Sequence, residues 1–136
     1  MRRYRGWIMV VCAAAALAQS SRSVWDGAFT ADQARRGESV SEKECVNCHG
    51  AALSGGEEAP ALEGAAFLSN WNSLTVGDLF DRIRKSMPQD DPARLTRQQD
   101  ADVLAYILSL NRFPAGKTEL STQSEVLKQI KIEAAK

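Results

Sequence analysis

The sequence predicts an all-α fold, with short helices packed around one core. Three segments combine helical spacing of apolar residues with capping signals, and no segment alternates apolar and polar residues as a half-buried strand would. Residues 50–72 are rich in glycine and show no sustained period, so we expect this stretch to fold around something other than itself. A chain of 136 residues, 44% of them hydrophobic, supplies one domain with a modest core.

The expected helices cover residues 31–45, 76–86 and 97–110. The first and the third each begin with a threonine followed three residues later by glutamine, at Thr30–Gln33 and Thr96–Gln99, which is the pattern of a capping box. In the second helix, apolar residues recur at i, i+3, i+4 and i+7 from Val76 to Ile83. A further short amphipathic stretch, residues 126–130, is expected to fold back on the domain.

The N-terminus has the three parts of a secretory signal peptide. Basic residues at positions 2, 3 and 5 precede an uncharged run from Gly6 to Ala18, which ends in the small-residue pattern Ala16-Leu17-Ala18. We expect residues 1–18 to be this signal and cleavage to follow Ala18, which predicts a periplasmic or otherwise exported protein. An uncleaved membrane anchor remains an alternative, although the run is short for a segment that spans a bilayer.

Charge excludes one class of partner. The whole chain has 17 basic and 17 acidic side chains, and loss of the three leader arginines would leave the mature protein acidic. A nucleic-acid-binding domain needs the opposite balance. Nucleic acid is therefore not expected as a partner.

The segment Cys45-Val46-Asn47-Cys48-His49 has the spacing of the attachment site of a c-type haem. Its two thiols are close enough along the chain to bond the two vinyl groups of one porphyrin, and the histidine that follows is then the axial ligand of the iron. The remaining cysteine, Cys12, lies in the expected signal. Cys45, Cys48 and His49 are thus the candidate residues for binding one covalently attached haem c, with His49 as a metal ligand.

Two other uses of a Cys-x-x-Cys pair fit the sequence less well. A thioredoxin-like dithiol is expected after a buried strand, whereas residues 34–44 before the pair are polar and helical in pattern. A structural zinc site needs four ligands, and no further cysteine or histidine follows His49.

The chain resembles the class I c-type cytochromes over residues 24–111. The resemblance rests on the order of a helix, Cys45-x-x-Cys48-His49-Gly50, a Pro60-Ala61-Leu62 loop, a Met87-Pro88 loop and a last helix with Leu104, Tyr106 and Ile107. It implies a small cytochrome c fold, with the helices packed around one covalently bound haem, in a cytochrome domain over 24–112 and a C-terminal tail over 113–136 that packs on it. One departure is Ser41, which stands where the family commonly has an aromatic residue at the crossing of the first and last helices.

The resemblance also implies the remaining haem contacts. The Pro60 carbonyl would accept a hydrogen bond from His49, unless Pro60 is a plain turn residue. Met87 would be the second iron ligand, and it is the only methionine that remains once the signal is removed. Its position before proline places it in an extended loop just beyond the second helix. Lys85, or an open iron site, remains an alternative to Met87.

These assignments predict an electron carrier rather than an enzyme. Two protein ligands on the iron leave no position for a small-molecule substrate, so the expected partners are redox proteins: a dehydrogenase donor, and a terminal oxidase or another acceptor. We expect a monomer. The segments 24–27, 87–88 and 111–116 are also similar to cytochromes associated with quinoprotein dehydrogenases, so a tightly held subunit of such a complex is an alternative. A haem peroxidase is the other alternative, but this chain has no second histidine for the acid–base catalysis that such an enzyme needs.

Overall fold

The computed structural model describes residues 22–136. The expected signal peptide therefore lies outside the described residues. In chain order the elements are β1 (Arg22–Ser23), the 3₁₀ turn η1 (Val24–Asp26), α1 (Ala31–Glu44), α2 (Val46–His49), the 3₁₀ turn η2 (Ala51–Leu53), α3 (Gly64–Trp71), α4 (Val76–Ser86), α5 (Arg97–Leu110), α6 (Ser124–Leu127) and β2 (Ile130–Lys131). The all-α prediction is confirmed, because the two strands of the described chain are a single parallel pair of two residues each.

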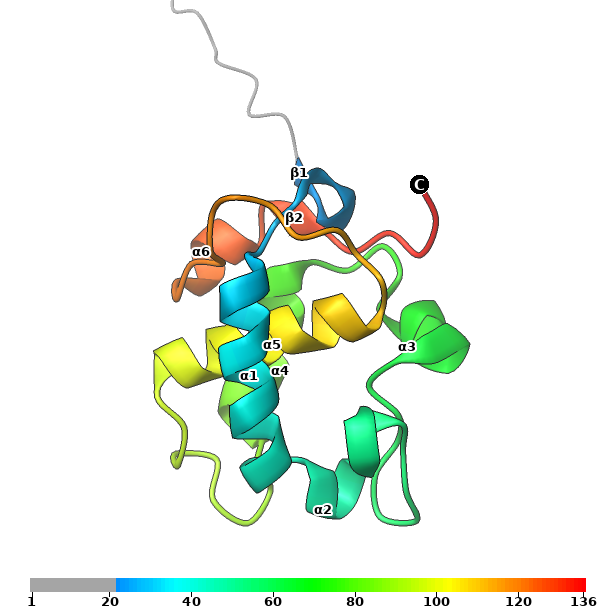
Figure 1. Ribbon diagram of the computed structural model, residues 1–136, viewed down its shortest axis with the longest axis vertical. Helices are drawn as coiled ribbons and strands as arrows, with labels where there is room; N and C mark the ends of the chain where they lie inside the picture. The colour runs from blue at the N-terminus through cyan, green and yellow to red at the C-terminus, as the bar shows by residue number, and fades with distance from the viewer. Residues whose placement is uncertain (1–21) are drawn as a thin grey trace, which may run out of the picture.

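Helices α1 and α5 cross at the centre of the domain (Figure 1). Gly37 makes this close crossing possible, since a Cβ at that position would overlap the main-chain carbonyl of Asp102 and lie 2.9 Å from Cβ of Tyr106. Ser41, one turn further along α1, is buried and its hydroxyl has no hydrogen-bond partner. The crossing is therefore built on backbone contact at Gly37, and the small Ser41 adds little apolar area to it.

The three expected helices are found with their threonine N-caps. Thr75 and Thr96 each form a complete capping box, with Asp78 and Gln99 as reciprocal partners. At the start of α1 only half of the predicted box forms. Thr30 accepts a hydrogen bond from the Gln33 amide, but the Gln33 side chain is buried and binds elsewhere.

The glycine-rich stretch differs from expectation because it contains regular structure. Residues 64–71 form α3, and a 3₁₀ turn covers residues 51–53. No side chain caps the start of α3 from its own N-cap position. Its first amide instead donates to the Asn111 side chain at the end of α5, at 3.1 Å. The local sequence carried no start signal because the cap comes from a residue distant in the chain.

The C-terminal segment contributes to the same core as the helices. Its buried apolar residues are Leu120, Leu127, Ile130 and Ile132. The Gln33 carboxamide holds this segment by exchanging two hydrogen bonds with the Leu120 backbone, of 2.7 and 3.3 Å. Helix α6 packs on α4 at Gly77, where a Cβ would lie 2.6 Å from the Lys128 backbone nitrogen. Within residues 22–136 no helix is both long and apolar enough to cross a membrane.

Candidate haem site

The two motif cysteines lie where α1 ends and the single turn α2 begins. Cys45 closes α1 through its amide, which donates to the Ser41 carbonyl at 2.9 Å, and its own carbonyl accepts from the His49 amide at 3.0 Å. Both thiols are free; Cys45 is half-buried and Cys48 is exposed. A helical turn thus presents both sulfurs and the following imidazole from one short segment.

The environment of the two thiols argues against a redox dithiol. Burial raises the pKa of the Cys45 thiol above its ordinary value. A hydrogen bond to the Glu58 carboxylate, 3.4 Å from Sγ, raises the pKa of Cys48. A reactive Cys-x-x-Cys pair needs a lowered pKa to form the thiolate nucleophile. Nor do the residues that the structure describes hold any group of three potential ligands that would suit a zinc ion.

His49 is held in one tautomer by the loop that follows the motif. The residue is 7% exposed, and its ring Nδ1 lies 2.7 Å from the Pro60 carbonyl oxygen. A carbonyl can only accept, so Nδ1 carries a proton, and in the neutral imidazole Nε2 then has a free lone pair for a metal. The structure therefore brings together the Pro60 and His49 groups that the resemblance paired.

Glycines allow the loop to fold tightly beneath His49. Gly50 has φ +79°, and a Cβ there would overlap the Gly55 carbonyl oxygen. The Gly55 amide in turn donates to the His49 carbonyl at 2.6 Å. Residues 50–55 thus form a close turn that returns the chain toward the motif, and a larger residue at Gly50 would open it.

The far end of the same loop is held by Asn111, the residue that follows α5. Its carboxamide accepts from the Gly64 amide and donates to the Leu62 carbonyl at 3.0 Å. Asparagine after a helix is a common C-terminal signal, so its sequence position gave no reason to expect a second role.

Met87 lies immediately after α4 in extended conformation, as predicted from the proline that follows it. Its side chain is half-buried and packs against the hydrophobic core. Lys85, the alternative ligand, is exposed on α4 and lies 3.8 Å from Asp81 in an ion pair. A half-buried thioether is the better donor of the two, because the Lys85 ammonium would first have to lose its proton and its partner.

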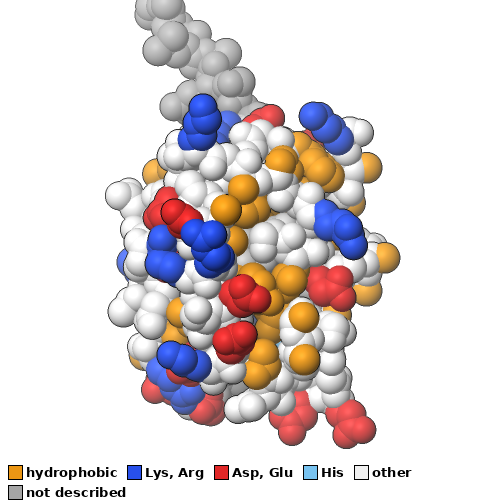
Figure 2. Space-filling model, in the orientation of Figure 1, with side chains coloured by type: hydrophobic (Ala, Val, Ile, Leu, Met, Phe, Trp, Pro, Cys, Tyr) orange, Lys and Arg blue, Asp and Glu red, His pale blue; other side chains and the backbone are white. Residues whose placement is uncertain are grey.

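Several apolar side chains pack on the core but are only partly buried. They are Val40, Val46, Leu62, Leu68, Trp71 and Met87. Figure 2 shows apolar side chains on the face that lies between α1 and α3 in Figure 1, with acidic side chains at its lower edge. Phe67 and Phe80, by contrast, are fully or almost fully buried. A large, mostly apolar group could cover apolar side chains that the protein leaves partly exposed.

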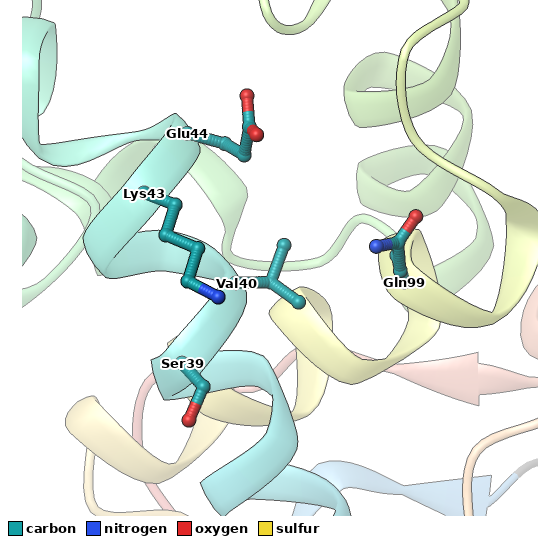
Figure 3. A pocket seen from close by; sticks show the side chains of 5 residues that line it. All are labelled: Ser39, Val40, Lys43, Glu44 and Gln99. Carbon is teal, nitrogen blue, oxygen red and sulfur yellow. The ribbon is translucent and has the colours of Figure 1, made fainter.

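A small surface pocket of about 110 Å³ lies elsewhere, between the outer sides of α1 and α5. Figure 3 shows that its lining side chains come from these two helices: Ser39, Val40, Lys43, Glu44 and Gln99. It includes no residue of the motif and is smaller than the roughly 300 Å³ of an ordinary ligand pocket. It therefore offers no competing cofactor site.

The donor set fits haem c. Two free thiols lie three positions apart, an imidazole follows with its Nε2 lone pair available, and a half-buried thioether stands on another element. These are the four protein groups that attach and ligate a c-type haem.

Comparison with known proteins decides the family. Residues 32–107 match the family described as cytochrome c oxidase, cbb3-type, subunit III. The chain belongs to this family. It is a class I c-type cytochrome, and the predicted family is confirmed. Membership of this family implies that the domain binds haem c and functions in electron transfer.

The fold of this cytochrome is shared with a solved structure of a redox enzyme. The sulfane dehydrogenase SoxCD from Paracoccus pantotrophus superimposes with a TM-score of 0.54 at 20% sequence identity, over 79% of this chain and 61% of that chain. The cytochrome thus spans less than two thirds of the length of the chain it matches. No curated protein is similar enough in sequence to be matched with it.

Proposed function

We propose that this cytochrome is an exported, mono-haem electron carrier that passes single electrons from a dehydrogenase to a terminal oxidase or another acceptor. The observation that carries the proposal is the 2.7 Å contact of His49 Nδ1 with the Pro60 carbonyl, directly after two free thiols. It leaves Nε2 as a ready ligand. The signal pattern of residues 1–18 supports export, and haem attachment through thioethers suits an oxidising compartment because it consumes both thiols.

The side chains have distinct roles in this proposal. The Cys45 and Cys48 thiols would each add across a vinyl group, sulfur to one carbon and hydrogen to the other, so no oxidant is needed. His49 and Met87 would hold the haem iron. The Pro60 carbonyl orients the imidazole and raises its basicity. When bound, haem c supplies a one-electron Fe(III)/Fe(II) couple.

Exposure of Cys48 supports this side of the domain as the one from which electrons would enter and leave. Its sulfur is at the surface, next to Glu58 and the exposed Asn47. A group bonded to this sulfur has an edge within reach of another protein. A carrier needs only a small and short-lived contact there, at the low end of interface sizes, below about 1,200 Å² in total.

A tightly held subunit of a redox complex is the second candidate. Two comparisons favour it: the family model describes an oxidase subunit, and the SoxCD structure is that of a dehydrogenase. The two candidates place the same haem site in different assemblies. They differ in whether the contact dissociates during turnover.

Rapid mixing tests the carrier role. The protein, matured with its haem, is mixed with a reduced quinoprotein dehydrogenase at several ionic strengths, and haem reduction is followed by absorbance. Fast reduction that depends on ionic strength supports the carrier. Peroxidase turnover with hydrogen peroxide well above that of free haem, or ready binding of carbon monoxide by the ferrous form at neutral pH, would contradict it.

Assembly state separates the two candidates. A periplasmic extract of the native cells is separated by size without detergent, and the fractions are stained for covalent haem. Staining at the mass of the monomer supports a mobile carrier. Staining that stays in a large complex at physiological ionic strength supports the subunit.

A further inference from the structure

The Asn111 carboxamide makes three hydrogen bonds at the end of α5. Oδ1 accepts from the Gly64 amide at 3.1 Å, while Nδ2 donates to the Leu62 carbonyl at 3.0 Å and to the Ile107 carbonyl at 2.9 Å. The residue is 7% exposed. The amide orientation is fixed by these partners, since a flipped amide would set its oxygen against two carbonyls and its NH₂ against an N–H.

These bonds anchor the segment that carries the Pro60 carbonyl. Leu62 is held on both sides: its amide donates to the Leu53 carbonyl at 2.8 Å, and its own carbonyl accepts from Asn111. Pro60 lies two residues earlier, and its carbonyl is the acceptor for His49. Within the described chain, the two hydrogen bonds with the Asn111 side chain are the ones that link residues 60–64 to the end of α5.

We propose that Asn111 is a positioning residue that acts on His49 through residues 62–64 and the Pro60 carbonyl. It ties the loop to α5, and α5 is itself fixed by its crossing with α1 at Gly37. This rigid support keeps the carbonyl on Nδ1. The inference rests on the proposed role of His49 as iron ligand.

The electronic consequence has a definite sign. A hydrogen bond from Nδ1 to a carbonyl gives the imidazole partial anionic character and makes it a more basic ligand, which favours Fe(III). Release of the loop would weaken that bond, and the reduction potential would rise. Simple loosening of the domain that lets water reach the haem would favour the charged ferric form and lower the potential. The direction of the shift therefore distinguishes positioning from a merely structural role.

The test compares Asn111→Leu with a matched control. Gln33→Leu also removes a buried carboxamide bonded to backbone, but its partner is Leu120 in the C-terminal segment. Covalent haem content is measured first, in the wild type and in both variants. If the wild type carries no covalent haem, the proposed function is refuted rather than this inference. With haem attached, Asn111→Leu is expected to raise the potential and to speed exchange of the His49 ring proton by about tenfold or more, because two hydrogen bonds to the loop are lost and one alone is worth up to about tenfold. Gln33→Leu is expected to lower the melting temperature and leave both readouts unchanged.

A measurement on the wild type covers the case in which Asn111→Leu does not fold. Hydrogen exchange of the ferrous holoprotein is followed by NMR. The His49 ring proton and the Gly64 amide proton should exchange with the same opening free energy, because the Asn111 side chain holds the loop that protects both. An unchanged or lower potential in Asn111→Leu would overturn the proposal. So would a His49 ring proton that stays protected when the Gly64 amide has exchanged.

Discussion

Gly37 of α1 lies directly against the main-chain carbonyl of Asp102 in α5. There is no room for a Cβ, because a methyl group at this position would overlap the carbonyl oxygen and crowd Tyr106. The same stretch of α5 is held laterally by Arg36, whose guanidinium contacts both carboxylate oxygens of Asp102 at 3.1 Å. A glycine and a bidentate ion pair on adjacent residues therefore fix how the two helices cross.

Gly37→Ala should destabilise the domain. The helices must separate to admit the methyl group, and overpacking of this kind costs about 1–3 kcal/mol. Equilibrium unfolding of the holoprotein in guanidinium chloride measures the loss. Glu38→Ala, on the exposed side of the same turn, is the control and should change stability by no more than about 0.5 kcal/mol. Equal stabilities for the two variants would show that the crossing adjusts without cost.

Covalent attachment can be read from mass. Expressed with the cytochrome maturation machinery, the wild type should gain the mass of one haem and retain it through acid–acetone extraction, since thioether bonds survive that treatment. The double variant Cys45→Ala/Cys48→Ala should carry no covalent haem. An unmodified wild-type mass, with both thiols reactive toward iodoacetamide, would refute attachment at these residues.

Met87→Leu tests the second iron ligand. Leucine keeps an apolar side chain of similar volume, so packing against the core is largely preserved while the sulfur is lost. The ferric wild type should show the weak near-infrared charge-transfer band of sulfur–iron ligation, and the variant should lose it and have a lower potential. Persistence of the band in the variant, or its absence from the wild type, would assign the position to another ligand.

Local patterns predicted the three main helices because their signals lie within a few residues of one another. The capping box of Thr75 and Asp78 involves only these two residues. The extended backbone of Met87 follows from Pro88 alone. The haem motif likewise lies within five consecutive residues, 45–49. Such features depend on short-range sterics and hydrogen bonds, which a single sequence displays directly.

What could not be predicted depends on partners far apart in the chain. Gln33 looked like the second half of a capping box, but its side chain binds Leu120, 87 positions away. Helix α3 was missed because its cap is Asn111, 47 positions from Gly64. Buried carboxamides of this kind have no periodic signature; their role emerges only when the fold brings an unpaired backbone group beside them.

Asp100 should make stability depend on pH between about 4 and 6. Asp100 lies in α5 and is 1% exposed; its Oδ2 pairs with Arg84 at 3.0 Å, while Oδ1 has no partner. Burial raises its pKa from 3.8 to about 6, although the charges of Arg84 and Arg97 oppose that shift. The folded protein therefore binds a proton that the unfolded chain has already lost in this range.

The sign follows from that proton. Between pH 4 and pH 6 the folded state holds more protons than the unfolded state, so the stability contributed by Asp100 is present at pH 4 and falls as pH rises, by up to about 3 kcal/mol in total. Asp100→Asn cannot ionise and should remove this slope, as measured by denaturant unfolding of the holoprotein at half-unit steps of pH. Asp78→Asn provides the opposite case: hydrogen bonds from Thr75 lower the pKa of Asp78, so its contribution is present above pH 4 and is lost only as pH falls below that value. If the wild type and Asp100→Asn have parallel profiles from pH 4 to 6, Asp100 ionises normally and its burial is offset by Arg84.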